Sequence, residues 1–357
     1  MPLVRKISQL TRMSAAALVA TTLAGCAQIA PAGGASPTPL APPSPSPTAS
    51  PVAAMPCRLP ANLRVDQGGN REVLGYLALP SGTTTDDPTD AIVKVADFPV
   101  GGTGTVPVWG TVTSPQLFGE SIGTFSPAAQ RWLPAAPELV SPDGLHYVYL
   151  HANGTIRLAA PDGSEIPVAN PNNLVPLAYT SSGVVLVESG PAANGLWLLD
   201  PATQSVSVIT PAAGTDDWLE VSGTIAFGLD SPGTLGAPLA TAVLVANLVA
   251  GTAPKTVYTA AAGDSIAAIA ADRQGGVLVV LTGASPGLVY VDSNAGPKPV
   301  AVLAGVAPAT IGPRHHADAH GIWFIGGDGI FLFNPAAGLQ KIAAAVTADI
   351  VPGGDCV

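Results

Sequence analysis

The sequence is poor in charge, in aromatic side chains and in cysteine. Charged residues make up 11% of its 357 residues, aromatic residues make up 5%, and there are 3 cysteines. A typical soluble domain is about one quarter charged. The net charge is −10, and the chain after residue 25 contains no basic cluster. Because phosphate contacts require a basic face, we expect no nucleic-acid partner.

The composition also excludes long helices. The chain contains 40 glycines and 37 prolines, and both residue types destabilise the interior of a helix. Short apolar runs separated by glycine and proline are typical of strands joined by tight turns. The composition therefore predicts an all-β protein.

The first residues have the features of a secretory signal peptide. Arg5, Lys6 and Arg12 precede an apolar run over 13–23, and small residues follow it. The run is too short to cross a bilayer comfortably as a permanent helix. We predict a signal peptide over residues 1–25.

The next feature is the tetrapeptide Leu23-Ala24-Gly25-Cys26. It resembles the lipobox of bacterial lipoproteins, and this resemblance implies that Cys26 is lipidated, with acyl chains such as palmitate, and becomes the mature N-terminus. Two or more acyl chains hold a protein stably on a membrane. The expected location is the cell membrane, on its extracytoplasmic side. The alternative is an ordinary signal peptide with an incidental cysteine.

Residues 26–56 are rich in Pro, Ser, Thr and Ala and contain no charged residue. Such a segment cannot bury enough apolar surface to fold, and its prolines favour an extended conformation. We therefore expect a disordered stalk between the lipidated cysteine and a folded domain at 57–357.

A repeat of about 40–50 residues runs through this domain, a period typical of β-propeller blades. Each repeat has a glycine turn before a strand and a second turn before an outer strand. The glycines are Gly144, Gly183, Gly223, Gly275 and Gly321, and four of the six outer turns contain Pro127, Pro161, Pro201 and Pro335. Six outer turns predict six blades. The oversized first unit, about 60–136, leaves a seventh blade open.

The segment Ser141-Pro142-Asp143-Gly144 carries a resemblance. It is similar to the repeat unit of WD40-like, TolB-type propellers, and the region 57–357 resembles bacterial surface lipoproteins with such a propeller.

The uncharged segment 231–254 could alternatively be a membrane helix. Its prolines, and its agreement with the blade period, favour strands.

Cys57 and Cys356 stand at the two ends of the predicted propeller. A propeller must close into a ring, so its first and last strands become neighbours. Secretion places both thiols in an oxidising compartment. We predict a Cys57–Cys356 disulfide in a monomeric propeller, with two free thiols as the alternative.

One segment gathers side chains that could bind a ligand or a metal. His315, His316, Asp318 and His320 lie within six residues, and alternation along a strand could place the last three on one side. The alternative is a polar loop at the channel mouth. Ser121 lies in a G-x-S-x-G pattern without the strand-to-helix context of a nucleophile elbow. We predict no catalytic residue, no bound cofactor and no defined metal site.

These features predict a membrane-anchored binding or scaffolding module for a protein, a peptide or an envelope glycan. The alternative is a propeller enzyme, a lyase or a glycan-active hydrolase, with a site near 314–320. The segment "AHGIWF" in that region resembles one unit of streptogramin-lyase propellers, and this resemblance is the basis of the alternative.

Overall fold

The computed structural model divides the chain into two compact units, 1–50 and 51–357. The structure describes residues 56–65, 72–87, 96–100, 104–108, 123–151, 154–188, 195–210, 217–230, 239–248, 253–293, 295–301, 315–326, 329–344 and 350–357. All of them belong to the second unit. The predicted signal peptide, the lipidation site Cys26, nearly all of the stalk and Ser121 lie outside the described residues.

The described part of the second unit contains six antiparallel sheets of three or four strands and two two-stranded sheets. The first consists of β27 (Val351–Pro352), β1 (Cys57–Val65), β2 (Glu72–Leu79) and β3 (Thr83–Asp86). The second consists of β8 (Tyr147–Leu150), β9 (Ile156–Ala159) and β10 (Glu165–Val168). The third consists of β11 (Leu174–Thr180), β12 (Gly183–Glu188), β13 (Leu196–Leu199) and β14 (Val206–Thr210).

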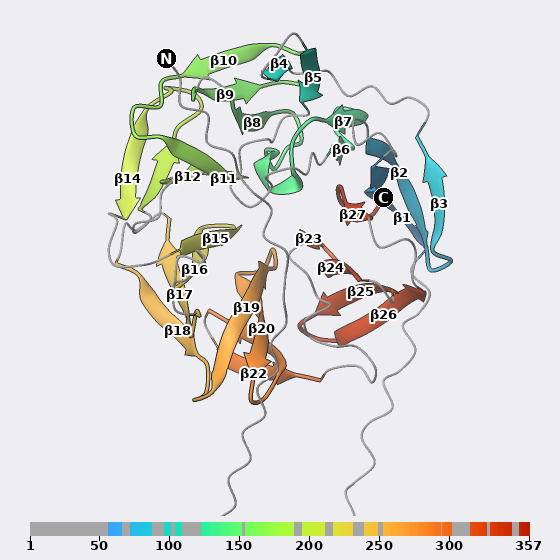
Figure 1. The fold of residues 1–357 in the computed structure, drawn as a ribbon, viewed down its shortest axis with the longest axis vertical. Coiled ribbons are helices and arrows are strands. Elements are labelled where there is room, and N and C mark those ends of the chain that lie inside the picture. The colour runs from blue at the N-terminus through green and yellow to red at the C-terminus, as the bar shows by residue number, and fades with distance from the viewer. Residues whose placement is uncertain are drawn as a thin grey trace, which may run out of the picture. The chain divides into compact units, whose positions relative to one another are not determined.

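The remaining three sheets each have four strands in chain order. They are β15 (Asp217–Ser222), β16 (Ile225–Leu229), β17 (Ala242–Asn247) and β18 (Lys255–Thr259); β19 (Asp264–Ala271), β20 (Gly276–Gly283), β21 (Gly287–Asp292) and β22 (Gly296–Val300); and β23 (His315–Asp318), β24 (Gly321–Gly326), β25 (Gly329–Asn334) and β26 (Gly338–Ala344). Figure 1 shows the six sheets following one another around a common centre. The prediction of a six-bladed β-propeller is confirmed.

The two repeated turns lie where the sequence predicts them. All five repeat glycines have a positive φ. Gly223 and Gly275 lie in the turn between the first and second strands of a four-stranded sheet, and Gly183 and Gly321 begin the second strand directly after that turn. At Gly183, with φ 131°, an added Cβ would stand 2.5 Å from the backbone oxygen of Leu199, so glycine is required there. Pro161, Pro201 and Pro335 precede the outer strands β10, β14 and β26.

The first predicted unit, 60–136, differs from the expectation. It contains the closing sheet and two separate two-stranded hairpins: β4 (Ala96–Val100) with β5 (Gly104–Val108), and β6 (Thr124–Ser126) with β7 (Arg131–Leu133). Pro127 forms the turn of the second hairpin. In the described part of this unit, the additional strands therefore pair as hairpins and not as a four-stranded seventh sheet. The short 3-10 helix η1 (Pro137–Leu139) leads from β7 toward β8.

The hydrophobic core lies between the sheets. One cluster of buried residues joins Leu158 of the second sheet to Leu186 of the third, and another joins Phe227 to Val279 of adjacent sheets. Strand alternation places apolar side chains on both faces of the sheets, and buried clusters join each sheet to the next from the second round to the first. Between the first and second sheets, Leu74 of β2 packs against Trp132 of the β6–β7 hairpin. This packing leaves the inner edge strands to line the centre.

The ring is closed by the last seven residues. Strand β27 pairs with β1 at Ala61 and Asn62, and Val357 exchanges two backbone hydrogen bonds with Arg58 at 2.8 and 3.0 Å. The backbone N–H of Phe125 in β6 donates to Gly353 O at 2.7 Å. The tail therefore contacts strands on two sides.

The two end cysteines form the disulfide that the sequence predicts. Cys57 and Cys356 are bonded, their Cα atoms are 5.7 Å apart, and 299 positions separate them in the chain. The uncharged segment 231–254 contains strand β17 where it is described. Within the part of the chain that the structure covers, no helix is long and apolar enough to span a bilayer.

Replacing Cys57 by serine should destabilise the ring. For a closed loop of 299 residues, chain entropy gives an upper bound of about 5–6 kcal/mol in the free energy of unfolding. Urea denaturation should show a lower midpoint for Cys57→Ser than for the parent. Cys26→Ser is the matched control, because position 26 lies outside the 57–356 loop that the disulfide closes, and it should leave the midpoint unchanged. Equal midpoints for both variants would contradict a stabilising role for the disulfide.

Candidate functional site

The six sheets surround a central cavity of about 1100 Å³. Its walls come from the strands nearest the centre in Figure 1, namely β11, β15, β19, β23 and β27, together with β6 and η1. Clefts of this size commonly hold ligands. Two groups of charged side chains line it, and each group brings together residues from different sheets.

The first group consists of Glu138, Glu220 and His315. The Nε2 atom of His315 in β23 lies 3.2 Å from Oε1 of Glu220 in β15, and both side chains are largely buried. A register shift between Trp218 and Glu220 leaves Leu219 unpaired. Such a bulge re-aims the side chains beside it, which helps to direct Glu220 into the cavity.

Glu138 faces the same pair from η1 and lines the cavity. Its side chain is exposed to the cavity. Burial, followed by repulsion from Glu220, raises the pKa of Glu138 to about 7, and attraction to His315 opposes this rise. A carboxyl group with a raised pKa keeps its proton to a higher pH than an ordinary glutamate does.

The second group consists of Arg273, His316 and Asp355. Arg273 donates two hydrogen bonds to the carboxylate of Asp355, at 2.8 and 2.5 Å. Nε2 of His316 lies 2.8 Å from Oδ1 of the same carboxylate. His316 is buried, whereas Arg273 and Asp355 are about half exposed. The bidentate geometry fixes the guanidinium plane of Arg273 at the cavity wall.

The pKa of Asp355 reflects these contacts. Burial works to raise it, but the hydrogen bonds from His316 and Arg273 outweigh burial and lower the pKa of Asp355 to about 2. The carboxylate is thus ionised throughout the neutral range. It reaches the cavity only because the closing tail carries it there.

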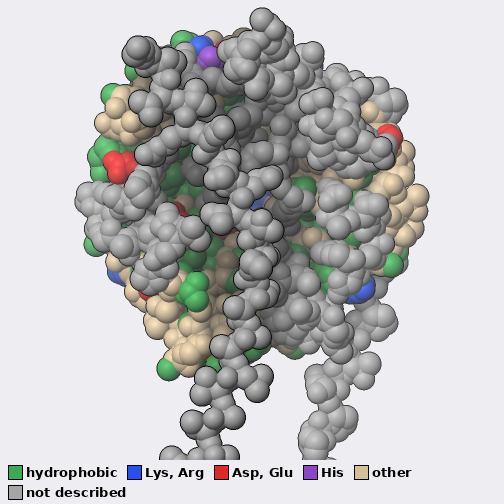
Figure 2. All heavy atoms as spheres, viewed as in Figure 1, with side chains coloured by type: hydrophobic (Ala, Val, Ile, Leu, Met, Phe, Trp, Pro, Cys, Tyr) green, Lys and Arg blue, Asp and Glu red, His purple; other side chains and the backbone are tan. Residues whose placement is uncertain are grey.

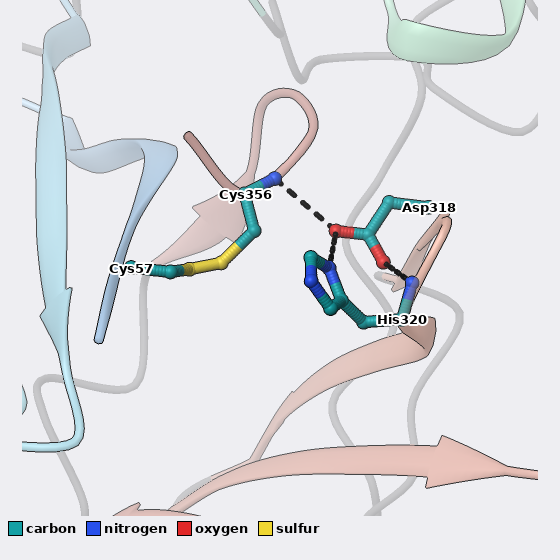
Figure 3. The surroundings of a disulfide bond; sticks show 4 residues. All are labelled: Cys57, Asp318, His320 and Cys356. Carbon is teal, nitrogen blue, oxygen red and sulfur yellow. Dashed lines mark hydrogen bonds and ion pairs between the residues drawn. A yellow bond between two sulfur atoms is a disulfide. The ribbon is translucent and has the colours of Figure 1, made fainter. Parts of the chain in front are cut away.

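The remaining two predicted residues lie beside the disulfide, outside the cavity lining. Asp318 ends β23 and is buried; its Oδ1 accepts a hydrogen bond from the backbone N–H of His320 at 2.7 Å. Its Oδ2 lies 3.2 Å from Nδ1 of His320 and accepts the backbone N–H of Cys356 at 3.1 Å. Figure 3 shows the imidazole of His320 between Asp318 and the disulfide.

The four residues predicted as one ligand or metal site therefore occupy three places. His315 faces Glu220, His316 faces Asp355, and Asp318 holds His320 near Cys356. The alternative, a polar loop at the channel mouth, does not describe residues 315–318, which form the inner strand β23. Consecutive residues of a strand point to opposite sides, which is why His315 and His316 find different partners.

Sequence reasoning missed Glu138, Glu220, Arg273 and Asp355. One signal was present: Glu220 and Arg273 each stand two or three residues before a repeat glycine, at the end of an inner strand. Charged residues are rare in this chain, so a charge at that repeat position could have been singled out. No comparable sequence signal marks Asp355 or Glu138.

No family model matches the chain, and no curated protein matches it. Similar solved structures include an oligogalacturonate lyase in complex with manganese, at 12% identity and a TM-score of 0.44, over 81% of this chain and 78% of that one. TolB from Acinetobacter baumannii has 10% identity and a TM-score of 0.42, over 86% and 69%. A post-proline cleaving enzyme from Rickettsia typhi has 12% identity and a TM-score of 0.43, over 82% and 45%. Identities this low bear on the fold alone.

Asp355→Asn should lower the free energy of unfolding at pH 7 by about 1 kcal/mol, an amount reduced by water around the exposed part of the carboxylate. The pKa of Asp355 is lower in the folded chain than its ordinary value of 3.8. Its contribution is therefore complete above about pH 4 and is lost as the pH falls toward 2.

Urea denaturation at a series of pH values measures this effect. The parent and Asp355→Asn should differ at pH 7 and converge between about pH 4 and pH 2. Asp355→Glu is the control that keeps the charge. A gap that stays constant over the whole series would show that the ion pairs are not its cause.

Proposed function

We propose that the chain is a lipid-anchored extracytoplasmic protein whose propeller binds a protein, a peptide or an envelope glycan. The observation that supports this function is the central cavity, where side chains from different sheets meet in fixed pairs. Side chains that are already held in place lose little conformational freedom when a ligand binds, so they orient the ligand at a low entropic cost. A polar segment of the partner enters the cavity.

The chemistry of the cavity suits a hydrogen-bonding ligand. Arg273 offers donors in a fixed plane, Glu138 and Glu220 offer acceptors, and Ser141 and Thr180 add hydroxyl groups to the lining. This combination of hydrogen-bond donors and acceptors matches the amides of a peptide or the hydroxyls of a glycan.

The described outer surface offers less for recognition. Its exposed large apolar side chains are separated in sequence and are few: Leu145, Ile166, Val208, Leu239 and Val357. Figure 2 shows charged side chains lying singly on the face drawn, where residues are coloured. Single apolar or charged residues are ordinary on any surface. The cavity is therefore the better candidate for ligand recognition.

The lipobox-like tetrapeptide at 23–26 and the proline-rich segment after it support the anchor. A lipid on Cys26 holds the chain at the membrane. An extended segment of about thirty residues then separates the propeller from the bilayer by up to about 90 Å. This spacing lets a cavity in the propeller reach partners within the envelope.

Blocking the cavity should abolish partner capture. Ala267 in β19 lines the cavity and its side chain is exposed there, so Ala267→Trp fills part of the space. Crosslinking and pull-down from the native envelope should recover at least ten times less partner with this variant. The matched control is Ala202→Trp, at an exposed position of the turn after β13. Equal recovery with both variants would contradict binding in the cavity.

A separate experiment tests the lipid anchor independently of the binding site. Cys26→Ser should move the protein from the detergent-rich phase to the aqueous phase of a Triton X-114 extract, while the solubilised chain still captures the partner. Retention in the detergent phase would contradict lipidation of Cys26 and leave the result for the cavity variant intact.

A second candidate function is that of an acid–base enzyme, such as a lyase or a glycan-active hydrolase. The observation that favours it is Glu138, whose pKa is raised to about 7 and which faces the His315–Glu220 pair. A catalytic acid or base works best with a pKa near the working pH. The group of Glu138, Glu220 and His315 differs from the site that the sequence predicted near 314–320, although both include His315.

An assay on polyuronates and peptidoglycan fragments tests the enzyme. Activity should change through about pH 7 and should fall about 10²- to 10⁴-fold in Glu138→Gln, the range for losing a general acid or base. Glu188→Gln, at the end of β12 and outside the cavity lining, should keep full activity. Absent turnover, or equal turnover in the two variants, would contradict the enzymatic function, and binding would remain as the proposed function.

A further inference from the structure

We propose that the reduced chain binds a zinc ion through Cys57, Cys356 and His320, with Asp318 orienting the imidazole. The disulfide and the metal are then two alternative closures of the same ring. This inference concerns the position where strand β1 meets the C-terminal tail, and it does not depend on the proposed binding function.

The four side chains already converge. One ligand atom from each of Asp318, His320 and Cys356 lies within 4.8 Å of the other two, and the sulfur of Cys57 is bonded to that of Cys356. Zinc–sulfur bonds of about 2.3 Å and zinc–nitrogen bonds of about 2.0 Å place the ligand atoms about 4 Å apart. Small side-chain rotations after reduction therefore suffice to surround an ion.

The disulfide form has no such site. A sulfur that is bonded to another sulfur is not a thiolate, and zinc requires thiolate ligands from cysteine. In that form, the imidazole of His320 is the one proposed ligand that remains available in this group. Metal binding here is consequently tied to the redox state of the two cysteines.

Asp318 makes His320 a suitable ligand. Its Oδ2 lies 3.2 Å from Nδ1 of the ring, so Nε2 is the nitrogen left free for a metal. A carboxylate that holds the other nitrogen of a histidine is the usual arrangement around protein zinc sites. Asp318 is itself fixed, because it is buried and accepts the N–H groups of His320 and Cys356.

The exchange balances as two steps. A dithiol reductant gives two electrons and two protons to the Cys57–Cys356 bond and is itself oxidised to a cyclic disulfide. Zinc then replaces the two protons of the cysteine thiols, and a water molecule completes the four-coordinate ion. Cys57 of the first strand and Cys356 of the tail are joined by sulfur–zinc–sulfur bonds in place of the sulfur–sulfur bond.

Access and stability both fit this exchange. Cys57 and Cys356 are half-buried, and the side chain of His320 is 40% exposed, so a small reductant and a metal ion can reach them. The tail keeps its backbone pairing with Arg58 and Ala61 after reduction, which holds the thiols close together. Because an ion that binds only the folded chain stabilises it, zinc should raise the melting temperature of the reduced protein.

The test measures zinc on the full chain in its two redox states. The protein is reduced with a phosphine, because a dithiol would bind the metal itself, and is then equilibrated with zinc and desalted. We expect one zinc per reduced chain, none per oxidised chain, and a melting temperature above that of reduced protein in a chelator. Cobalt in place of zinc should give strong visible bands and a thiolate charge-transfer band, as tetrahedral sulfur sites do.

Single substitutions identify the ligands. His320→Ala should lose stoichiometric zinc, and Asp318→Asn should weaken the affinity about 10- to 100-fold. His146→Ala is the matched control, because His146 is an exposed histidine far along the chain from the disulfide; it should bind as the parent does. Thermal melting of each oxidised variant first checks that the variant folds. If His320→Ala does not fold, His320→Gln is used in its place.

Two results would overturn the inference. One is a reduced parent that retains no zinc after desalting. The other is a folded His320→Ala or His320→Gln chain with the affinity of the parent, which would show that the imidazole is not a ligand.

Discussion

The pairing of the last seven residues with the first strand is the constraint on which the rest of the structure depends. Five sheets form from strands that follow one another in the chain, but the first needs β27 from the other end. Without this pairing, the inner edge of the first sheet would expose unpaired backbone groups beside β6. The ring is thus a property of the whole chain, and the disulfide makes its closure covalent.

The same tail builds one side of the candidate site. Gly353 has no room for a side chain, because an added Cβ would stand 2.6 Å from Gly123 O. This close approach seats the tail, and Asp355 then reaches Arg273 and His316, while Cys356 reaches Asp318. Ring closure and the candidate site therefore share residues of the tail, so a change in the tail affects both the stability of the ring and the charged groups that line the cavity.

The sequence predicts the features that are local in the chain. The repeat glycines and prolines specify turns within single sheets, and for this reason the six-bladed fold and its outer strands could be predicted. The site could not, because Glu138 in η1, Glu220 in β15 and His315 in β23 are far apart in the chain and meet only when the ring forms. The neighbouring histidines 315 and 316 suggested a single cluster, but strand alternation directs one toward Glu220 and the other toward Asp355.

The separation of 299 positions between the joined ends has a consequence for the order of folding. Hairpins within a sheet close short loops and form quickly, whereas contacts between distant parts of a chain must wait for the intervening segments to order. The later sheets can assemble as soon as their own strands are available. The first sheet is the earliest to be synthesised and the last to be completed, and the cavity acquires Asp355 only at that final step.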